Sequence, residues 1–183
     1  MGFDMRVIGV TGLPGSGKSF VFEKAKERGA VVVCMGDIIR EKAAERGENV
    51  GTTARKLREE QGQYIVAKLT VEKIREFLQE YTESKIVLID GIRSPYEIEM
   101  FDASFDDFIS LSLYASPKTR FERITLRNRK DDSSVYEDFK ERDQRELDFG
   151  IGEVIATADF LIKNEDTFEA YEEEVVEFLN QQM

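Results

Sequence analysis

Short apolar runs alternate along the chain with longer charged stretches in which apolar residues recur at helical spacing. Several of the runs are continuously hydrophobic, which is typical of parallel strands covered by helices on both faces. The pattern predicts an α/β architecture of three layers, in which strand–helix units build a five-stranded parallel sheet and ligands bind at the carboxyl ends of the strands. The predicted strands are Arg6–Thr11, Ala30–Cys34, Lys85–Asp90, Phe108–Tyr114 and Asp159–Ile162.

Two polar stretches interrupt this alternation. Segment 37–83 is longer than one crossover helix requires, and Gly47, Gly51 and Gly62 divide it into about three helices. Segment 127–149 is very polar and rich in Arg and Asp, as expected of a short cover over a site rather than of core. We predict one domain over 1–183, made of core segments 1–36, 84–126 and 150–183, a helical insertion at 37–83 and a lid at 127–149.

The last segment of the chain, 167–179, has the spacing of an amphipathic helix. Its aromatic side chains are interpreted as packing rather than as part of a binding site. The side chains predicted to point inward are Phe168, Tyr171, Val175, Phe178 and Leu179.

A glycine-rich loop joins the first predicted strand to a helix-like segment, Phe20–Arg28. Its glycines let several backbone N–H groups point at one anion, and the following helix adds its positive end. Lys18 is expected to reach the β and γ phosphates, and Ser19 to bind Mg²⁺. The context and all four fixed positions match the phosphate-binding loop, which predicts a P-loop NTPase fold that binds ATP. The loop residues are Gly12, Leu13, Pro14, Gly15, Ser16, Gly17, Lys18 and Ser19.

The amino-acid composition excludes several kinds of functional site. The net charge of −11 disfavours a nucleic-acid binder that relies on a general positive field. One cysteine and no histidine exclude a disulfide framework, a zinc site and a histidine base. Since no apolar run is long enough to span a bilayer and the N-terminus lacks a signal-peptide pattern, we expect a cytoplasmic protein with no membrane or nucleic-acid partner.

The third predicted strand ends in an acid, Asp90. In phosphate-loop proteins such an acid normally lies beside Mg²⁺, although a cap of the next helix is an alternative role for an aspartate. The next residue is Gly91 rather than the second acid that ATP-driven motors use to activate water. The Asn-Lys-x-Asp signature, with which switch GTPases recognise guanine, is also missing. Residues 163–166 contain similar residues, but in a different order. These features favour a small-molecule kinase.

The chain resembles the nucleoside monophosphate kinases, and adenylate kinase above all. Four segments carry the resemblance in the family's order, and together they extend over nearly the whole chain. They are Gly36-Asp37-Ile38-Ile39-Arg40, Asp90-Gly91-Ile92-Arg93, Arg123-Ile124-Thr125-Leu126-Arg127, and Arg129-Lys130-Asp131-Asp132 followed by Arg142 and Arg145. Over its full length the chain is most similar to archaeal adenylate-kinase-related proteins, and segment 158–165 is similar to dephospho-coenzyme A kinases.

The resemblance implies a role for each matched residue. Gly36, Asp37, Arg40 and Arg93 would bind the acceptor phosphate, and Arg123 would lie against the donor base. Lys18, Arg93, Arg127, Arg129 and Arg142 would act on the transferring phosphoryl group, with Arg145 as a substitute for Arg142. Ser19 and Asp90 would hold Mg²⁺. Arginine suits these roles because its planar guanidinium binds phosphate in two places.

The sequence also departs from the adenylate kinase pattern. Asp90 to Arg93 is one residue shorter, the lid is short, and a Gln after the Asp-Gly pair is not evident. Three functions therefore stay open. They are a kinase of nucleoside monophosphates such as AMP, a dephospho-coenzyme A kinase-like transferase in which Asp37 would serve as the base for a hydroxyl acceptor, and a nucleotide-binding regulator with slow turnover. The sequence does not indicate an oligomeric state.

Overall fold

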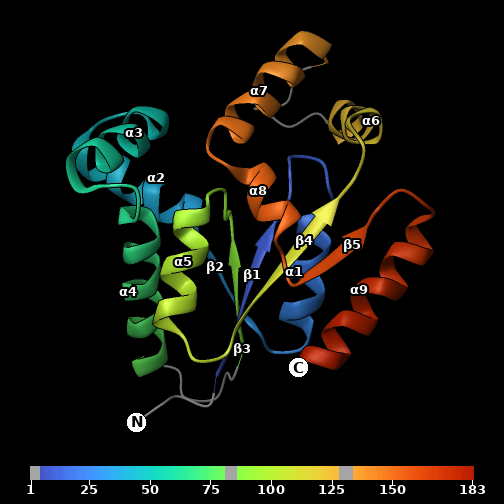
Figure 1. Cartoon of the computed structure of the whole chain (residues 1–183), viewed down its shortest axis with the longest axis horizontal. Helices are drawn as coiled ribbons and strands as arrows, with labels where there is room; N and C mark the ends of the chain where they lie inside the picture. The colour runs from blue at the N-terminus through green and yellow to red at the C-terminus, as the bar shows by residue number, and fades with distance from the viewer. Residues whose placement is uncertain (1–4, 81–85, 128–133) are drawn as a thin grey trace.

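The computed structural model describes residues 5–80, 86–127 and 134–183, with the side chains of Gln79 and Glu80 excepted. Five parallel strands form one sheet in the order β2-β3-β1-β4-β5 (Figure 1). The predicted parallel α/β sheet is confirmed, and its strands differ from the predicted runs by one residue at most among the described residues. The strands are β1 (Arg6–Thr11), β2 (Val31–Cys34), β3 (Ile86–Asp90), β4 (Phe108–Tyr114) and β5 (Phe160–Lys163).

Helices cover both faces of the sheet, which explains the continuous hydrophobic runs. Alternate residues of one strand point to opposite faces, so Val7 of β1 joins one core cluster and Ile8 joins the other. The first cluster packs under α2, α3, α4, α5 and α8, and the second lies under α1 and α9. The helices are α1 (Lys18–Glu27), α2 (Met35–Arg46), α3 (Val50–Gln61), α4 (Ile65–Glu80), α5 (Pro95–Ser104), α6 (Pro117–Arg127), α7 (Tyr136–Asp148), α8 (Ile151–Ala156) and α9 (Phe168–Gln182).

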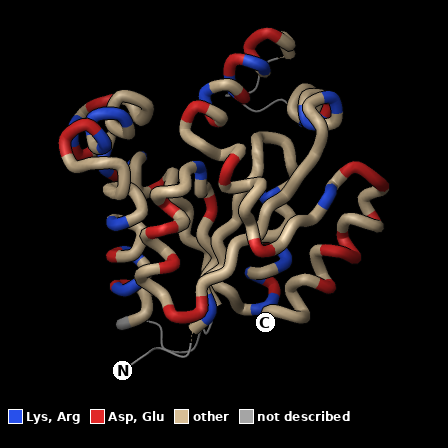
Figure 2. Tube along the Cα trace, viewed as in Figure 1, with Lys and Arg blue, Asp and Glu red and all other residues tan. Residues whose placement is uncertain are grey.

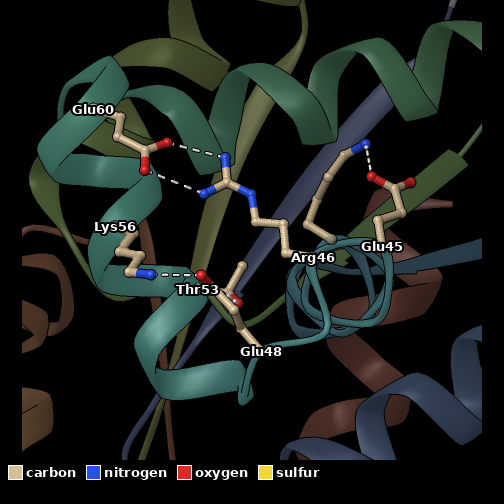
Figure 3. A network of polar contacts seen from close by, with 7 residues as sticks. Glu45, Arg46, Glu48, Thr53, Lys56 and Glu60 are labelled. Atoms are coloured by element: carbon tan, nitrogen blue, oxygen red, sulfur yellow. Dashed lines mark hydrogen bonds and ion pairs between the residues drawn. The ribbon is translucent and has the colours of Figure 1, made fainter.

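The long stretch after β2 folds as the three helices α2, α3 and α4, as predicted. Polar contacts hold α3 against α2 at the surface (Figure 3). Arg46 of α2 donates two hydrogen bonds to Glu60 of α3, at 3.0 and 3.3 Å, and Lys56 of α3 pairs with Glu48 in the connecting turn. The turn itself is set by Gly47, whose φ of 65° is in the left-handed region that favours glycine.

The carboxyl ends of the strands meet at one end of the molecule. The helices α6 and α7 rise above this end in Figure 1, and Figure 2 shows Lys and Arg segments on both of them. The helix α9 lies beside β5 and carries mostly acidic segments in the same view. Within the described ranges, no helix has the length and apolar character required to cross a bilayer.

One predicted core residue is placed differently. The side chain of Phe168, at the start of α9, is 57% exposed instead of packed inward. It lies edge-on against Phe20 of α1, with ring centroids 5.1 Å apart. The other predicted inward residues of this helix, Tyr171, Val175, Phe178 and Leu179, are buried.

Candidate active site

The glycine-rich loop joins β1 to α1, as the phosphate-loop motif predicts. Gly12, Gly15 and Gly17 have φ angles of 143°, 85° and 110°, a region that other residues rarely adopt. Gly12 also has no room for a side chain, since an added Cβ would lie 2.5 Å from the backbone oxygen of Leu113. The glycines are therefore required by backbone geometry at this turn.

Lys18 folds back over the loop. Its ammonium donates hydrogen bonds to the backbone oxygens of Gly12 and of Leu13, the latter at 3.3 Å. Burial lowers the pKa of Lys18 to about 8, although Asp90 and Glu146 act in the opposite direction. A bound anion would raise this pKa again, because it favours the charged ammonium.

A cavity of about 750 Å³ opens beside the loop and gathers most of the predicted site residues. They come from segments far apart in the sequence, so the fold brings them together. Leu13, Ser16, Asp37 and Arg145 do not line this cavity, and Arg129 lies outside the described residues. The predicted residues on its wall are Gly12, Pro14, Gly15, Gly17, Lys18, Ser19, Gly36, Arg40, Asp90, Arg93, Arg123, Arg127 and Arg142.

The wall of this cavity is positive, in contrast to the chain as a whole. Among the residues that the structure describes, six cationic side chains line it, against three carboxylates. The net charge of the chain is −11. Such a local excess of positive charge in a concave site attracts polyanions. The cations are Lys18, Arg40, Arg93, Arg123, Arg127 and Arg142, and the carboxylates are those of Glu23, Asp90 and Glu146.

Asp90 ends β3 beside Cys34, its neighbour in β2. Burial raises the pKa of Asp90, while the charges of Lys18 and Arg93 act to lower it. Asp90 does not cap the next helix, because Ser94 and Glu97 form the capping box of α5. Asp90 and the exposed Ser19 both face the cavity, and their oxygens are the donors that Mg²⁺ prefers.

Arg93 reaches the cavity despite the shortened segment that carries it. The buried carboxylate of Glu97 accepts hydrogen bonds from the backbone N–H groups of Arg93, at 2.7 Å, and of Ser94, at 3.2 Å. This closes the turn after β3. The Arg93 guanidinium then lies 3.3 Å from a carboxylate oxygen of Glu146 in α7. The Glu97 carboxylate therefore fixes the backbone of the turn that carries Arg93.

Arg40 approaches the cavity from the first turns of α2. Its guanidinium pairs with the exposed Asp37 on the same helix and lies 3.9 Å from the Cys34 sulfur. Asp37 raises the pKa of Arg40, whereas partial burial opposes that rise. Arg40 therefore stays charged, and its pairing uses only part of the guanidinium's five donors.

Three further side chains, which the motifs did not identify, bind backbone oxygens of the loop, and two of them, Asn164 and Tyr171, also line the cavity. Arg120 donates to the backbone oxygen of Pro14 at 3.2 Å, Asn164 to that of Ser16 at 3.0 Å, and Tyr171 to that of Gly17 at 3.0 Å. The buried Arg120 also pairs with Asp143 of α7. Asn164 accepts a hydrogen bond from Arg123 at 3.0 Å. A single arginine in a charged helix carries no sequence signal for such a role, and Tyr171 is predicted only as packing.

Comparison with known proteins identifies the family. A family profile described as "AAA domain" matches residues 8–147. A UPF0200 protein from Methanothermobacter thermautotrophicus is 52% identical over 162 residues, which are 88% of this chain and 83% of that relative. The chain belongs to the UPF0200 family. The AAA-domain match of this UPF0200 chain includes the phosphate loop, β3 with Asp90, and all of α6.

Solved structures share the fold of this UPF0200 chain. The protein TT1252 from Thermus thermophilus superposes with a TM-score of 0.66 at 19% identity, over 98% of each chain. Shikimate kinase from Bacteroides thetaiotaomicron superposes with a TM-score of 0.61 at 17% identity, over 97% of this chain and 98% of its own. The P-loop kinase-like α/β fold is therefore confirmed.

Proposed function

We propose that this protein transfers the γ-phosphoryl group of ATP to a small nucleotide, a nucleoside monophosphate such as AMP. The observation that carries the proposal is the set of six cations that line the cavity, among the described residues, in a chain whose net charge is −11. Two nucleotide anions repel each other, and the transition state spreads further negative charge over the equatorial oxygens. Positive groups held in place before the reaction relieve both problems.

The positions of the cations suggest how the two substrates divide the cavity. The phosphate loop and Lys18 would hold the donor phosphates, with Arg123 beside the donor base. Arg40 follows β2 and Arg93 follows β3, and these two strands are neighbours in the sheet, so both arginines can bind one acceptor phosphate. Arg127 and Arg142 would contact the transferring group, together with Arg129 if it extends to the site.

This chemistry needs no general base, because the oxygen of an acceptor phosphate is already ionised near neutral pH. Ser19 and Asp90 would hold a Mg²⁺ ion together with phosphate oxygens, and that ion would neutralise charge on the β and γ phosphates. The side chains of the protein then orient the two phosphates and exclude water.

The contacts of Lys18 and Arg93 fit an exchange of partners during binding. Lys18 donates to loop oxygens, and Arg93 pairs with Glu146. Lys18 and Arg93 are thus each held near the cavity by a partner that a phosphate group can replace. Such preplacement reduces the cost of ordering side chains during binding.

The alternative with a hydroxyl acceptor receives less support. It requires a carboxylate base, for which the sequence offers Asp37. Asp37 pairs with Arg40, is exposed, and does not line the cavity. No distance or burial favours it as a base, so a dephospho-coenzyme A kinase-like reaction and the regulator are kept as outcomes of the test.

The test is a panel of acceptors mixed with ATP, Mg²⁺ and the protein, in which ADP release is followed. The panel contains AMP, CMP, UMP, GMP, dephospho-coenzyme A and shikimate, the last because shikimate kinases share the fold. Fast release with one nucleoside monophosphate and little with water supports the proposal. Fast release with dephospho-coenzyme A or shikimate contradicts the acceptor class, and slow release with every acceptor despite tight ATP binding indicates the regulator.

A further inference from the structure

Three backbone oxygens of the phosphate loop accept hydrogen bonds from side chains of distant segments. The oxygens of Pro14, Ser16 and Gly17 accept hydrogen bonds from Arg120, Asn164 and Tyr171, at 3.2, 3.0 and 3.0 Å. These donors come from α6, from the end of β5 and from α9. Residues more than a hundred positions from the loop therefore help to set the direction of three of its carbonyl groups. The Gly17 oxygen also accepts a hydrogen bond from the Phe20 N–H of α1, at 3.1 Å.

The direction of a carbonyl group also decides the direction of the next N–H group. In a planar trans peptide, the C=O of one residue and the N–H of the next point in opposite directions. Holding the oxygens of Pro14, Ser16 and Gly17 toward these donors therefore turns the N–H groups of Gly15, Gly17 and Lys18 away from the donors. Convergent N–H groups are what make such a loop an anion site.

The three donors are themselves held in place. Arg120 is 2% exposed, donates to the Ala115 oxygen at 3.1 Å, and binds Asp143 through both terminal nitrogens. Asn164 is 5% exposed, and its backbone N–H donates to the Tyr114 oxygen at 2.8 Å. Tyr171 is 3% exposed. Buried groups with fixed partners lose little further freedom when they position the loop.

The fit between these side chains and the loop is close. A Cβ added at Gly17 would contact the Asn164 amide and would lie 2.9 Å from the Tyr171 hydroxyl oxygen. Gly17 therefore lets the two side chains approach the backbone of the loop. Position 17 therefore requires glycine for two reasons, the close approach of side chains from the C-terminal part of the chain and a φ of 110°.

We propose that Arg120, Asn164 and Tyr171 form a carbonyl brace, a set of positioning residues that orients the phosphate-loop N–H groups toward the donor triphosphate. The brace concerns the binding of phosphate groups and rests on the proposed function only for the identity of the donor. Two of its members extend to other walls of the cavity. Arg120 is tied through Asp143 to α7, and Asn164 is tied to Arg123.

The most specific test removes one hydrogen bond and keeps the ring. Tyr171→Phe deletes the hydroxyl that donates to Gly17. Tyr64→Phe is the matched control, because the Tyr64 hydroxyl also donates one hydrogen bond, to Glu99 at 2.6 Å, and Tyr64 does not line the cavity. Calorimetric titration of each protein with inorganic tripolyphosphate, and separately with Mg²⁺ and adenylyl imidodiphosphate, measures phosphate binding with and without a base.

The brace predicts that Tyr171→Phe weakens both ligands by the same factor, about 3- to 10-fold, as expected for the loss of one oriented hydrogen bond. Tyr64→Phe should bind both as wild type does. The amide signals of Gly17 and Lys18 in the nitrogen–proton NMR spectrum of the ligand-free protein should move in Tyr171→Phe only. Wild-type affinity for tripolyphosphate in Tyr171→Phe, or unchanged Gly17 and Lys18 signals, would overturn the brace.

A second variant covers the case in which Tyr171→Phe folds poorly. Asn164→Ala removes the donor to Ser16 without adding charge, and it should also weaken tripolyphosphate binding several-fold. Acceptor turnover is not used in either test, so a wrong acceptor assignment leaves the brace intact. If the wild-type protein binds neither phosphate ligand, both the brace and the proposed function are wrong.

Discussion

Arg93, which follows β3, and Glu146, on α7, form an ion pair of 3.3 Å at the cavity. The Arg93 side chain is 45% exposed and that of Glu146 is 14% exposed, so the contact lies at a solvent boundary. In the proposed reaction an acceptor phosphate must take the place of this carboxylate. The position of Glu146 on α7 thus affects whether Arg93 can bind a phosphate group.

Replacing Glu146 by Gln should strengthen AMP binding. The variant removes a competing anion from Arg93, and screened pairs of this kind are worth a fraction of a kcal/mol up to about 1 kcal/mol, which corresponds to roughly 2- to 5-fold in the dissociation constant. Calorimetric titration with AMP measures the effect. Glu153→Gln, a change on α8 outside the cavity, provides the control. Weaker AMP binding in Glu146→Gln would show that Glu146 assists the acceptor instead of competing with it.

Lys18 should make the ligand-free protein less stable at neutral pH. Its folded pKa of about 8 lies below the ordinary value of 10.5, mainly because of burial. Below pH 8 the lysine is charged in both states, and the folded state bears the full cost. As pH rises from 8 to 10.5 the folded state releases its proton first, so this group's contribution to stability increases.

Lys18→Met should therefore raise the free energy of unfolding at pH 7, by about 1–3 kcal/mol, and the gain should shrink above pH 8. Urea unfolding of both proteins at pH 7 and pH 9.5 measures this difference. The same variant should lose ATP binding. A gain that grows with pH would contradict the depressed pKa.

Arg127→Ala should lower turnover with ATP and AMP by about 10²-fold or more, as expected for the loss of a group that stabilises charge in the transition state. Arg55→Ala is the control, since Arg55 is 70% exposed on α3, pairs only weakly with Glu59 at 3.8 Å, and does not line the cavity. Steady-state rates of ADP formation by the two variants and the wild-type protein measure this effect. Unchanged turnover in Arg127→Ala would reject its assigned role.

Phe168→Ala should weaken binding of the donor nucleotide through its base. Phe168 lines the cavity with its side chain 57% exposed, and Arg123 lines the same cavity. Stacking of a base on an aromatic ring is worth about 1–3 kcal/mol, so a loss of roughly 5-fold or more is expected for adenylyl imidodiphosphate. Tripolyphosphate should bind as before. Leu161→Ala, at the same exposure but outside the cavity, should change neither affinity.

The sequence predicted the features that depend on local patterns. Continuous apolar runs identified all five strands, and the spacing of Gly12 to Ser19 identified the phosphate loop. Arg40, Arg93, Arg123, Arg127 and Arg142 were predicted only through their order relative to known motifs, and the fold places them around one cavity. Their roles in the reaction, like the division into core, insertion and lid, stay predictions.

Other features depend on tertiary contacts that no local pattern encodes. Glu146 and Asp143 lie in a charged stretch of the kind that usually faces solvent, yet they pair with Arg93 and Arg120. Phe168 has the helical spacing of a core residue, but it is the first residue of α9 and the helix exposes it at the cavity. Helical spacing identifies the apolar face without showing where a neighbouring element stops covering it.

The central claim is that two nucleotide anions meet in this cavity and exchange a phosphoryl group. Its most direct test incubates the protein with Mg²⁺, AMP and ATP labelled with radioactive phosphorus at the γ position, and separates the products. The account predicts that the label appears in the β position of ADP, at a rate that depends on AMP. Label that appears only as inorganic phosphate, at the same rate with and without AMP, would contradict it.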